Sequence, residues 1–391
     1  MRLFFARTYK VAFLLCILLV VLSACGGTSS SNAKSKTSAG TSGNASNGGD
    51  NATIATTPQV QAGPRPCPSV VSDPSYWDPI VITQSGVNAV TSVVCGNLTE
   101  SNTIQAVVTS QFEGAGQVAD IYVFDNITSP SPTRLFFLQG LYKGSAKIST
   151  YGTLLTAEVD QGSSANQHAA NGNYQQDLFR EFAWSDGAGT FVPVSFPGIF
   201  PDLTRYQAES DQQQVGQGNN TWKLNAADVA SKLASQLLNW KNIASSTITS
   251  GGGQHDSNAV VTVKNTSGGS IQVTLGRLEG NTNTGIWEAT AVSGSNLSIT
   301  TPQNRDVLHS PFTISGTGNA ANGKIGTITV LDHLYNNVTK GTVNATGGSA
   351  SGNTSFSTSV SYTVSFKTGT QEGLVILDAG SGAIILKELL D

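Results

Sequence analysis

Short stretches in which apolar and polar residues alternate recur along most of this chain, and they limit the folds that it can adopt. Segments such as "IQAVVTSQ", "ADIYVFDN" and "SIQVTLGRL" are separated by turns rich in Gly, Asn and Ser. Alternation with a period of two places the apolar side chains on one face of a β-strand. Because such segments continue over more than 300 residues, the sequence predicts a mainly β, multidomain protein.

The first 24 residues have the layout of an export signal. Arg2, Arg7 and Lys10 precede an apolar run over residues 11–22, and small residues follow that run. A run of this length is too short for an ordinary membrane-spanning helix but suits a secretory signal. We therefore interpret residues 1–24 as a signal peptide.

The segment "LSAC" at the end of this signal resembles the signal of bacterial lipoproteins. The resemblance implies that Cys25 receives a diacylglycerol on its thiol and becomes the first residue of the mature chain. Acyl chains contribute about 0.8 kcal/mol per buried CH₂, so two or three chains hold a protein at a membrane. The expected location is the extracytoplasmic face of the cell membrane. The alternative is an ordinary secretory signal with an unmodified cysteine.

The segment that follows the expected lipidation site is rich in Ser, Gly and Asn. It contains no aromatic residue and almost no charge up to residue 63. Such a composition buries too little apolar surface to offset the entropy lost on ordering. The sequence therefore predicts that residues 25–63 are the lipidated cysteine and a flexible linker.

Two cysteines, Cys67 and Cys95, remain outside the signal and the expected anchor. In an exported protein such a pair is more often a disulfide than two free thiols, and the sequence favours the bridge without excluding the thiols. No CxxC or Cys/His spacing points to a redox or metal site, and no cofactor is predicted.

The charge of the chain argues against nucleic acid as a partner. Removing the three basic residues of the signal from the total of 21 leaves 18 against 25 acidic residues, a formal charge of −7. No basic cluster offsets this acidic balance. We expect the membrane to be one partner, through the anchor, and an envelope protein or cell-wall component to be another.

A first β-rich domain is expected over residues 64–199. Within it, "CGNLTESNTIQAVV" and "DIYVFDN" resemble the FG-GAP repeats of extracellular proteins, which implies a strand–turn–strand unit. In that pattern acidic side chains hold calcium, but Asn97, Thr99 and Ser101 stand at the corresponding positions. Calcium prefers carboxylate oxygens, so calcium binding stays open and no metal ligand is assigned.

A small α+β domain is expected over residues 200–296. The stretch "NAADVASKLASQLLNW" begins at Asn225, a good N-cap, and Val229, Leu233, Leu237 and Trp240 recur on one helical face. Three strand-like segments follow this helix. A helix laid on one face of a small antiparallel sheet buries the apolar stripes of both.

The C-terminal residues 297–391 contain about seven short strand-like segments at the spacing of a β-sandwich. The segments "SPFTISG" at 310–316, "VLD" at 330–332 and "GLVI" at 373–376 resemble the bacterial spore-germination immunoglobulin-like domain. The resemblance implies an immunoglobulin-like β-sandwich in an exported or lipid-anchored envelope protein. It brings no catalytic residues.

Two stretches resemble catalytic motifs without completing them. "GNAANGK" at 318–324 has the spacing of a phosphate-binding loop, but Ile325 follows where Ser or Thr is needed, so we predict a hairpin turn. "KTG" at 367–369 lacks the Ser-x-x-Lys on a folded segment and the Ser-Asp-Asn that accompany it in penicillin-binding enzymes.

The histidines and tryptophans give no clear site. Four histidines lie far apart and are interpreted as surface or core-edge residues: His168, His255, His309 and His333. Trp240 and Trp287 fall on apolar stripes, which favours the core, whereas the turn-like surroundings of Trp77 and Trp222 leave their role open.

The sequence thus predicts a non-enzymatic, lipid-anchored protein of the cell envelope that presents β-rich binding modules outside the cytoplasmic membrane. One alternative is an accessory protein of spore germination or cell-wall assembly that docks through its C-terminal domain. Another alternative is a cell-wall hydrolase, which requires convergent titratable groups in one pocket.

Overall fold

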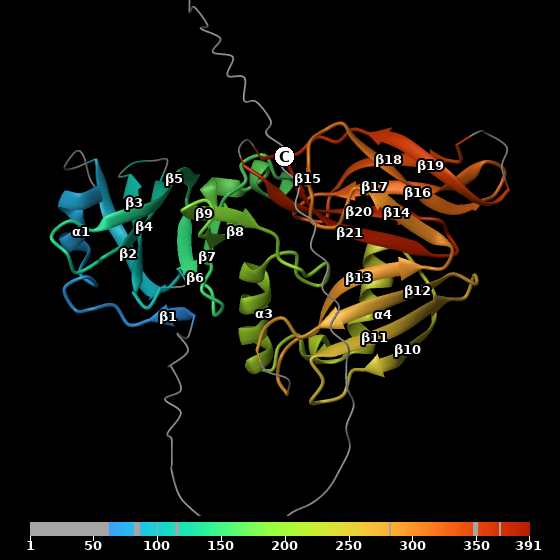
Figure 1. Ribbon diagram of the computed structural model, residues 1–391, viewed down its shortest axis with the longest axis horizontal. Coiled ribbons are helices and arrows are strands. Elements are labelled where there is room, and N and C mark those ends of the chain that lie inside the picture. Colours follow the sequence, from blue (N-terminus) through green and yellow to red (C-terminus); the bar gives the residue numbers. More distant parts are fainter. Residues whose placement is uncertain are drawn as a thin grey trace, which may run out of the picture. The chain divides into compact units, whose positions relative to one another are not determined.

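The computed structural model describes residues 62–81, 87–99, 101–112, 114, 117–280, 283–346, 351–366 and 369–391 (Figure 1). These residues belong to one compact unit, Pro58–Asp391. The prediction of a mainly β protein is confirmed, because antiparallel sheets make up most of the regular structure. The predicted signal peptide, Cys25 and nearly all of the predicted linker lie outside the described residues. None of the described helices combines the length and the hydropathy that crossing a membrane requires.

Two sheets that pack face to face form the first part of the unit. The five-stranded sheet has the order β1 (Gly63–Arg65), β2 (Asn88–Asn97), β3 (Gln105–Phe112), β4 (Val118–Asp125) and β5 (Thr133–Tyr142). The four-stranded sheet has the order β6 (Ser145–Ile148), β7 (Leu154–Glu158), β8 (Leu178–Ser185) and β9 (Thr190–Val194). Ile121 of β4 and Phe182 of β8 belong to one buried cluster, so the inner faces of the two sheets share a core.

Helix α1 (Pro74–Val81) covers part of the outer face of the five-stranded sheet. Trp77 of this helix is fully buried and packs on Phe124 of β4, with ring centroids 5.0 Å apart. Trp77 is therefore a core residue, which settles the role that the sequence left open. The helix spans only eight residues, too few for a helical period to be recognised in the sequence.

Helix α4 (Ala226–Leu237) confirms the predicted helix of the middle region. The side chain of Asn225 accepts hydrogen bonds from the backbone N–H groups of Ala227 and Asp228, as expected of an N-cap. Figure 1 shows α4 lying along one face of the sheet of this region. Val229 and Leu233 of α4 are fully buried in the core between the helix and the sheet. The strands of that region are β10 (Ile243–Gly251), β11 (Asn258–Asn265), β12 (Ser270–Gly276) and β13 (Glu288–Gly294).

Four short or hydrophilic helical segments were not predicted: α2 (Ser164–Gln167), η1 (Ala170–Gly172), α3 (Arg205–Gly216) and η2 (Thr221–Leu224). Helix α3 begins with a capping box in which Thr204 and Gln207 satisfy each other's backbone groups. It contains few apolar residues and therefore has no apolar stripe.

The C-terminal region is a two-sheet sandwich. Its strands are β14 (Leu297–Thr301), β15 (Val307–Leu308), β16 (Phe312–Ala320), β17 (Lys324–Leu331), β18 (Asn337–Asn344), β19 (Gly352–Val360), β20 (Gln371–Asp378) and β21 (Ala383–Leu390). The sheet β14-β16-β19 packs against β17, β18, β20 and β21, and Ile314, Val330 and Val375 are fully buried between them.

A single sheet crosses the domain boundary that the sequence predicts between residues 296 and 297. Val292 of β13 pairs with Ile385 of β21, so nine strands from the middle and C-terminal regions form one sheet. One buried cluster contains Val229 of α4, Trp287 and Ile376 of β20. The two regions therefore share both a sheet and a core.

Candidate functional site

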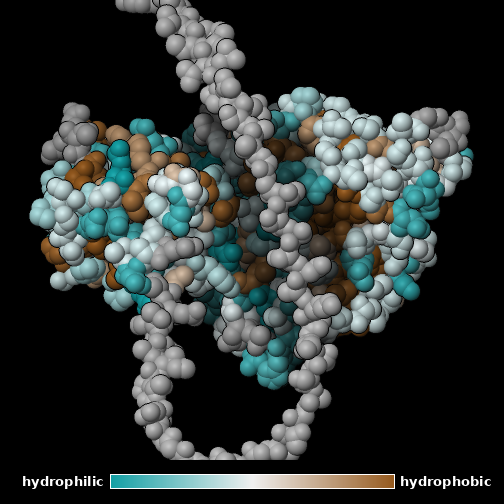
Figure 2. All heavy atoms as spheres, viewed as in Figure 1, coloured by the Kyte–Doolittle hydropathy of each residue, from teal (hydrophilic) through white to brown (hydrophobic). Residues whose placement is uncertain are grey.

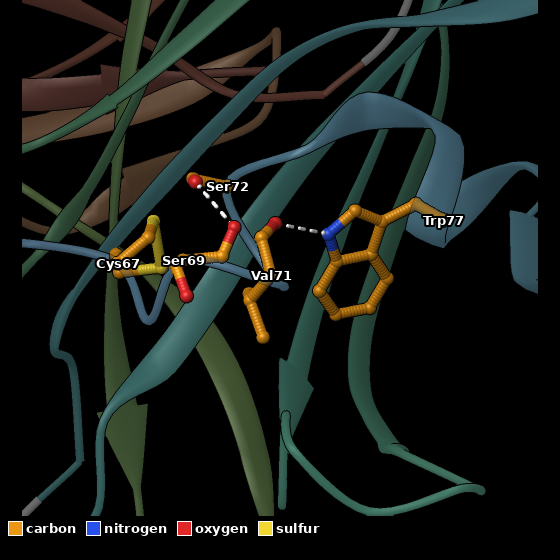
Figure 3. Close-up of a disulfide and its surroundings, with 6 residues drawn as sticks. Cys67, Ser69, Val71, Ser72 and Trp77 are labelled. Atoms are coloured by element: carbon orange, nitrogen blue, oxygen red, sulfur yellow. Dashed lines mark hydrogen bonds between the residues drawn. A yellow bond between two sulfur atoms is a disulfide. The ribbon is translucent and has the colours of Figure 1, made fainter.

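A disulfide joins Cys67 to Cys95 near the beginning of the described chain (Figure 3). Cys95 lies on β2 and pairs with Arg65 of β1, so the bridge fastens the segment after β1 to the sheet. In the same segment Trp77 Nε1 donates a hydrogen bond of 2.8 Å to the carbonyl of Val71. The covalent bridge and the buried indole together fix the start of the folded region.

The loop that resembles an FG-GAP repeat is held by side-chain amide and hydroxyl groups together with one carboxylate, that of Asp125. Asn97 Nδ2 donates to the carbonyl of Thr103, and Gln105 Nε2 donates to Thr103 Oγ1 at 2.8 Å. Thr103 Oγ1 in turn donates to Asp125. Within the described ranges no group of three His, Cys, Asp or Glu side chains is placed to hold a metal ion.

The stretch at 318–324 forms the turn that the sequence predicts. Ala321 and Lys324 exchange backbone hydrogen bonds of 2.9 and 3.1 Å, and Asn322 and Gly323 between them have φ values of 52° and 78°. This is a two-residue turn of the kind that Asn-Gly favours. In the other motif-like stretch, residues 367 and 368 lie outside the described residues.

The interpretation of the histidines as surface or core-edge residues is wrong for His333, which lies in the interior. It is only 3% exposed, and neither ring nitrogen has a hydrogen-bond partner. Burial lowers its pKa, against the opposing influence of Asp332 and Asp160. The other three histidines, His168, His255 and His309, are exposed.

Asp160 brings His333 near a serine, which raises the question of catalysis. Ser365 Oγ donates a hydrogen bond to Asp160 Oδ2, and His333 Nε2 lies 3.9 Å from that same oxygen. A serine nucleophile needs a base that accepts its own proton. Here the serine is bonded to the carboxylate and not to the imidazole, so these three residues do not form a nucleophile–base pair.

Ion pairs centred on Arg205 connect α3 with the first and middle regions. The guanidinium lies 2.7 Å from Glu181 Oε1 of β8 and 2.6 Å from Glu279 Oε1. Burial raises the pKa of Glu279 to about 7, and the nearby carboxylates of Glu209 and Glu181 add to this effect against the attraction of Arg205. Because the carboxyl groups are held by Arg205, we interpret the cluster as a structural junction.

A second buried pair holds the connection between the first and middle regions. Lys387 Nζ of β21 donates to the carbonyls of Gly198 and Leu203. Glu372 of β20 accepts hydrogen bonds from the backbone N–H of Phe196 and from the hydroxyl of Ser195. No local pattern indicates this pair, because its two residues lie more than 170 positions along the chain from the segment that they hold.

An open groove lies on the outer face of the five-stranded sheet, beside α1. Strand alternation directs Asp120, Tyr122 and Phe124 of β4 to this face, and Phe137 of β5 pairs directly with Tyr122. Among the residues that line the groove are Asn88, Phe112, Asp120, Tyr122, Arg134 and Phe137. Over the region of α1 and β2–β5, Figure 2 shows apolar and hydrophilic residues side by side.

Aromatic rings and a buried carboxyl group define the chemistry of this groove. The ring centroids of Tyr122 and Phe137 are 4.8 Å apart, and the Arg134 guanidinium lies 5.4 Å from the centre of the Phe137 ring. Asp120 Oδ1 accepts a hydrogen bond from the backbone N–H of Gly140, and burial raises the pKa of Asp120. The groove can therefore offer both stacking and hydrogen bonding to a ligand.

The segment that contains Asp120 and Tyr122 was predicted from the sequence as a strand and as part of an FG-GAP-like unit, and no binding surface was predicted there. The alternation in "ADIYVFDN" places Asp, Tyr and Phe on one face, and this was the available signal for a polar and aromatic surface.

No model of a known protein family matches this chain, and no curated protein shows significant similarity to it.

Proposed function

We propose that this chain is a non-enzymatic, lipid-anchored protein of the bacterial cell envelope that presents its β-rich unit outside the cytoplasmic membrane. The disulfide between Cys67 and Cys95 is the observation that carries the proposal. Disulfides persist in oxidising compartments and are rare in the bacterial cytosol. This bridge therefore supports export independently of the signal-like N-terminus and of the lipoprotein-like "LSAC".

The arrangement of the sheets supports a display role. The middle and C-terminal regions share one sheet, and the Lys387–Glu372 pair holds the segment that enters them from the first region. A unit connected in this way presents its loops and sheet faces in fixed relative positions. The two-sheet sandwich at 297–391 agrees in architecture with the proposed kinship to spore-germination immunoglobulin-like domains. An envelope protein or a cell-wall component is the proposed partner.

The described clusters of charged residues support the non-enzymatic part of the proposal. Arg205 is paired with two carboxylates, and Lys387 is hydrogen-bonded to backbone carbonyls at a junction. The serine near His333 is bonded to Asp160 instead of to the imidazole. These contacts support a connecting role for Arg205, Lys387 and Asp160.

The proposal is tested by substituting the expected lipidation site and fractionating cells. We expect the natural chain to incorporate labelled palmitate and to remain with washed membranes, whereas Cys25→Ala removes the label and releases the protein. Cys16→Ala is the matched control, because it removes a cysteine of the signal and leaves the acceptor thiol. Retention of Cys25→Ala in membranes washed with carbonate would contradict the anchor.

A further inference from the structure

We propose that the groove beside α1 binds a linear polysaccharide, with a sugar ring stacked on Phe137 and a sugar hydroxyl donating to Asp120. The inference rests on the proposed function, because a protein displayed in the envelope meets cell-surface and cell-wall glycans. It adds to that function a binding site and the class of ligand.

The groove exists because α1 covers only part of the sheet face. Trp77 of α1 packs with Val108 of β3 and Phe124 of β4 in one buried cluster, which closes that part of the face. Strand β5 lies at the edge of the sheet, beyond β4. Phe137 on β5 consequently remains 38% exposed although it contacts Tyr122.

Exposed aromatic rings give the groove a surface for stacking. Phe112 on β3 is 37% exposed and lines the same groove as Phe137. The two rings lie two strand spacings apart across the sheet and four residues apart along it, which is roughly 16 Å by strand geometry. Two flat apolar surfaces at this separation fit a chain of several pyranose rings better than a single sugar.

Asp120 supplies a hydrogen-bond acceptor for the hydroxyl groups of such a chain. This residue is only 5% exposed, and its Oδ1 accepts from Gly140 N at 3.0 Å. Its other oxygen has no hydrogen-bond partner among the described residues and belongs to a side chain that lines the groove. A carboxylate oxygen without a partner in the protein can accept a charge-assisted hydrogen bond from a donor that arrives with a ligand.

The charges around the groove favour a neutral ligand. Asp120 and Arg134 are the only charged residues among the described residues that line it, and their charges are opposite. A strongly acidic or basic peptide would find no surface of opposite net charge in this groove. A neutral polyhydroxylated chain matches the combination of aromatic faces, one carboxylate, one guanidinium and the amide of Asn88.

The proposal is tested by titrating the purified full-length protein with cellohexaose, chitohexaose and maltohexaose in a calorimeter, with glucose as the monomer control. We expect at least one hexasaccharide to bind and glucose to bind at least tenfold more weakly. Phe137→Ala and Asp120→Asn should each raise the Kd of that hexasaccharide at least tenfold. Ile248→Ala is the matched control, since Ile248 is 41% exposed on the edge strand β10, and it should leave the Kd unchanged.

Circular dichroism and thermal unfolding verify that each variant is folded. If Phe137→Ala does not fold, Phe112→Ala replaces it, because Phe112 exposes a similar fraction of its surface. Absence of binding to all three hexasaccharides, or an unchanged Kd in the folded groove variants, would overturn the proposal. Binding is measured in solution, so this failure would leave the fractionation result with Cys25→Ala unaffected.

Discussion

Lys387 Nζ lies 3.6 Å from Glu372 Oε2, and the two side chains are almost completely removed from solvent. Burial lowers the pKa of Lys387, and burial raises the pKa of Glu372, while the attraction between the two groups opposes both effects. Removing one member of such a pair leaves an uncompensated charge in the interior, which costs more than removing both.

We therefore predict that Lys387→Met lowers the free energy of unfolding by about 3–5 kcal/mol. The substitution leaves Glu372 without its cation and the carbonyls of Gly198 and Leu203 without their donor. The double variant Lys387→Met/Glu372→Leu should be more stable than Lys387→Met alone. Urea unfolding followed by circular dichroism measures both, and a double variant less stable than the single one would contradict this account.

The buried carboxyl group of Glu388 should make the folded protein less stable as the pH rises. Burial raises the pKa of this carboxyl group to about 9, and the negative charge of nearby Asp306 adds to this effect. The folded protein keeps the proton up to that pH, whereas the unfolded chain releases it above a pH of about 4.3. The contribution of Glu388 to stability is therefore fully present below pH 4.3 and is lost as the pH rises toward 9.

The corresponding variant, Glu388→Gln, should remove this dependence. We expect it to be more stable than the natural chain at pH 8 by about 2–3 kcal/mol, with the difference shrinking toward pH 5. Denaturant unfolding at pH 5, 6.5 and 8 measures the trend. An equal difference at all three pH values would show that Glu388 does not titrate as described.

The buried imidazole of His333 should have the opposite effect, so that the protein becomes less stable as the pH falls. Because burial lowers its pKa, the unfolded chain binds a proton near pH 6.5 while the folded protein stays neutral at this residue. Asp332, Asp160 and Asp177 oppose the shift and Arg180 reinforces it. Stability from this group should therefore be present above pH 6.5 and decline as the pH falls through that value.

The matched variant for this second trend is His333→Gln, which carries no titrating group. Its unfolding free energy should fall less steeply than that of the natural chain between pH 6.5 and 5. Parallel curves for the two proteins over this range would be inconsistent with a buried neutral imidazole.

The disulfide should make a measurable contribution to stability. Cys67 and Cys95 are 28 positions apart, and closing a loop of this size stabilises a protein by about 3–4 kcal/mol in the chain-entropy description. We expect Cys67→Ser/Cys95→Ser to unfold at lower urea concentration than the natural chain. Dithiothreitol should shift the natural chain toward the variant and leave the variant unchanged. A variant as stable as the oxidised protein would argue against the bridge.

The sequence predicted those elements in which local pattern and burial agree. The helix α4 was predicted from its N-cap Asn225 and the spacing of Val229 and Leu233, and all three residues have the expected roles. Helix α3 was missed because it buries polar groups such as Glu209, so it has no apolar stripe. The sequence Thr204-x-x-Gln207 was a capping signal that could have revealed its start.

The groove and the buried pairs depend on contacts that a linear pattern does not contain. The alternation on β4 places Asp120 and Tyr122 on one face, but the sequence does not show that α1 leaves this part of the face open. Similarly, the pairing of Val292 with Ile385 joins strands separated by most of the C-terminal sandwich. Such pairings depend on the topology of the complete fold.

The position of β21 between β13 and β20 sets an order for the folding of the chain. During synthesis β13 is made long before β21, so its edge has no partner until residues 383–390 have been added to the chain. An exposed strand edge is a template for pairing with other chains. The incompletely synthesised chain is therefore the form most in need of a chaperone, and premature termination before β21 would yield aggregation-prone fragments instead of a smaller working protein.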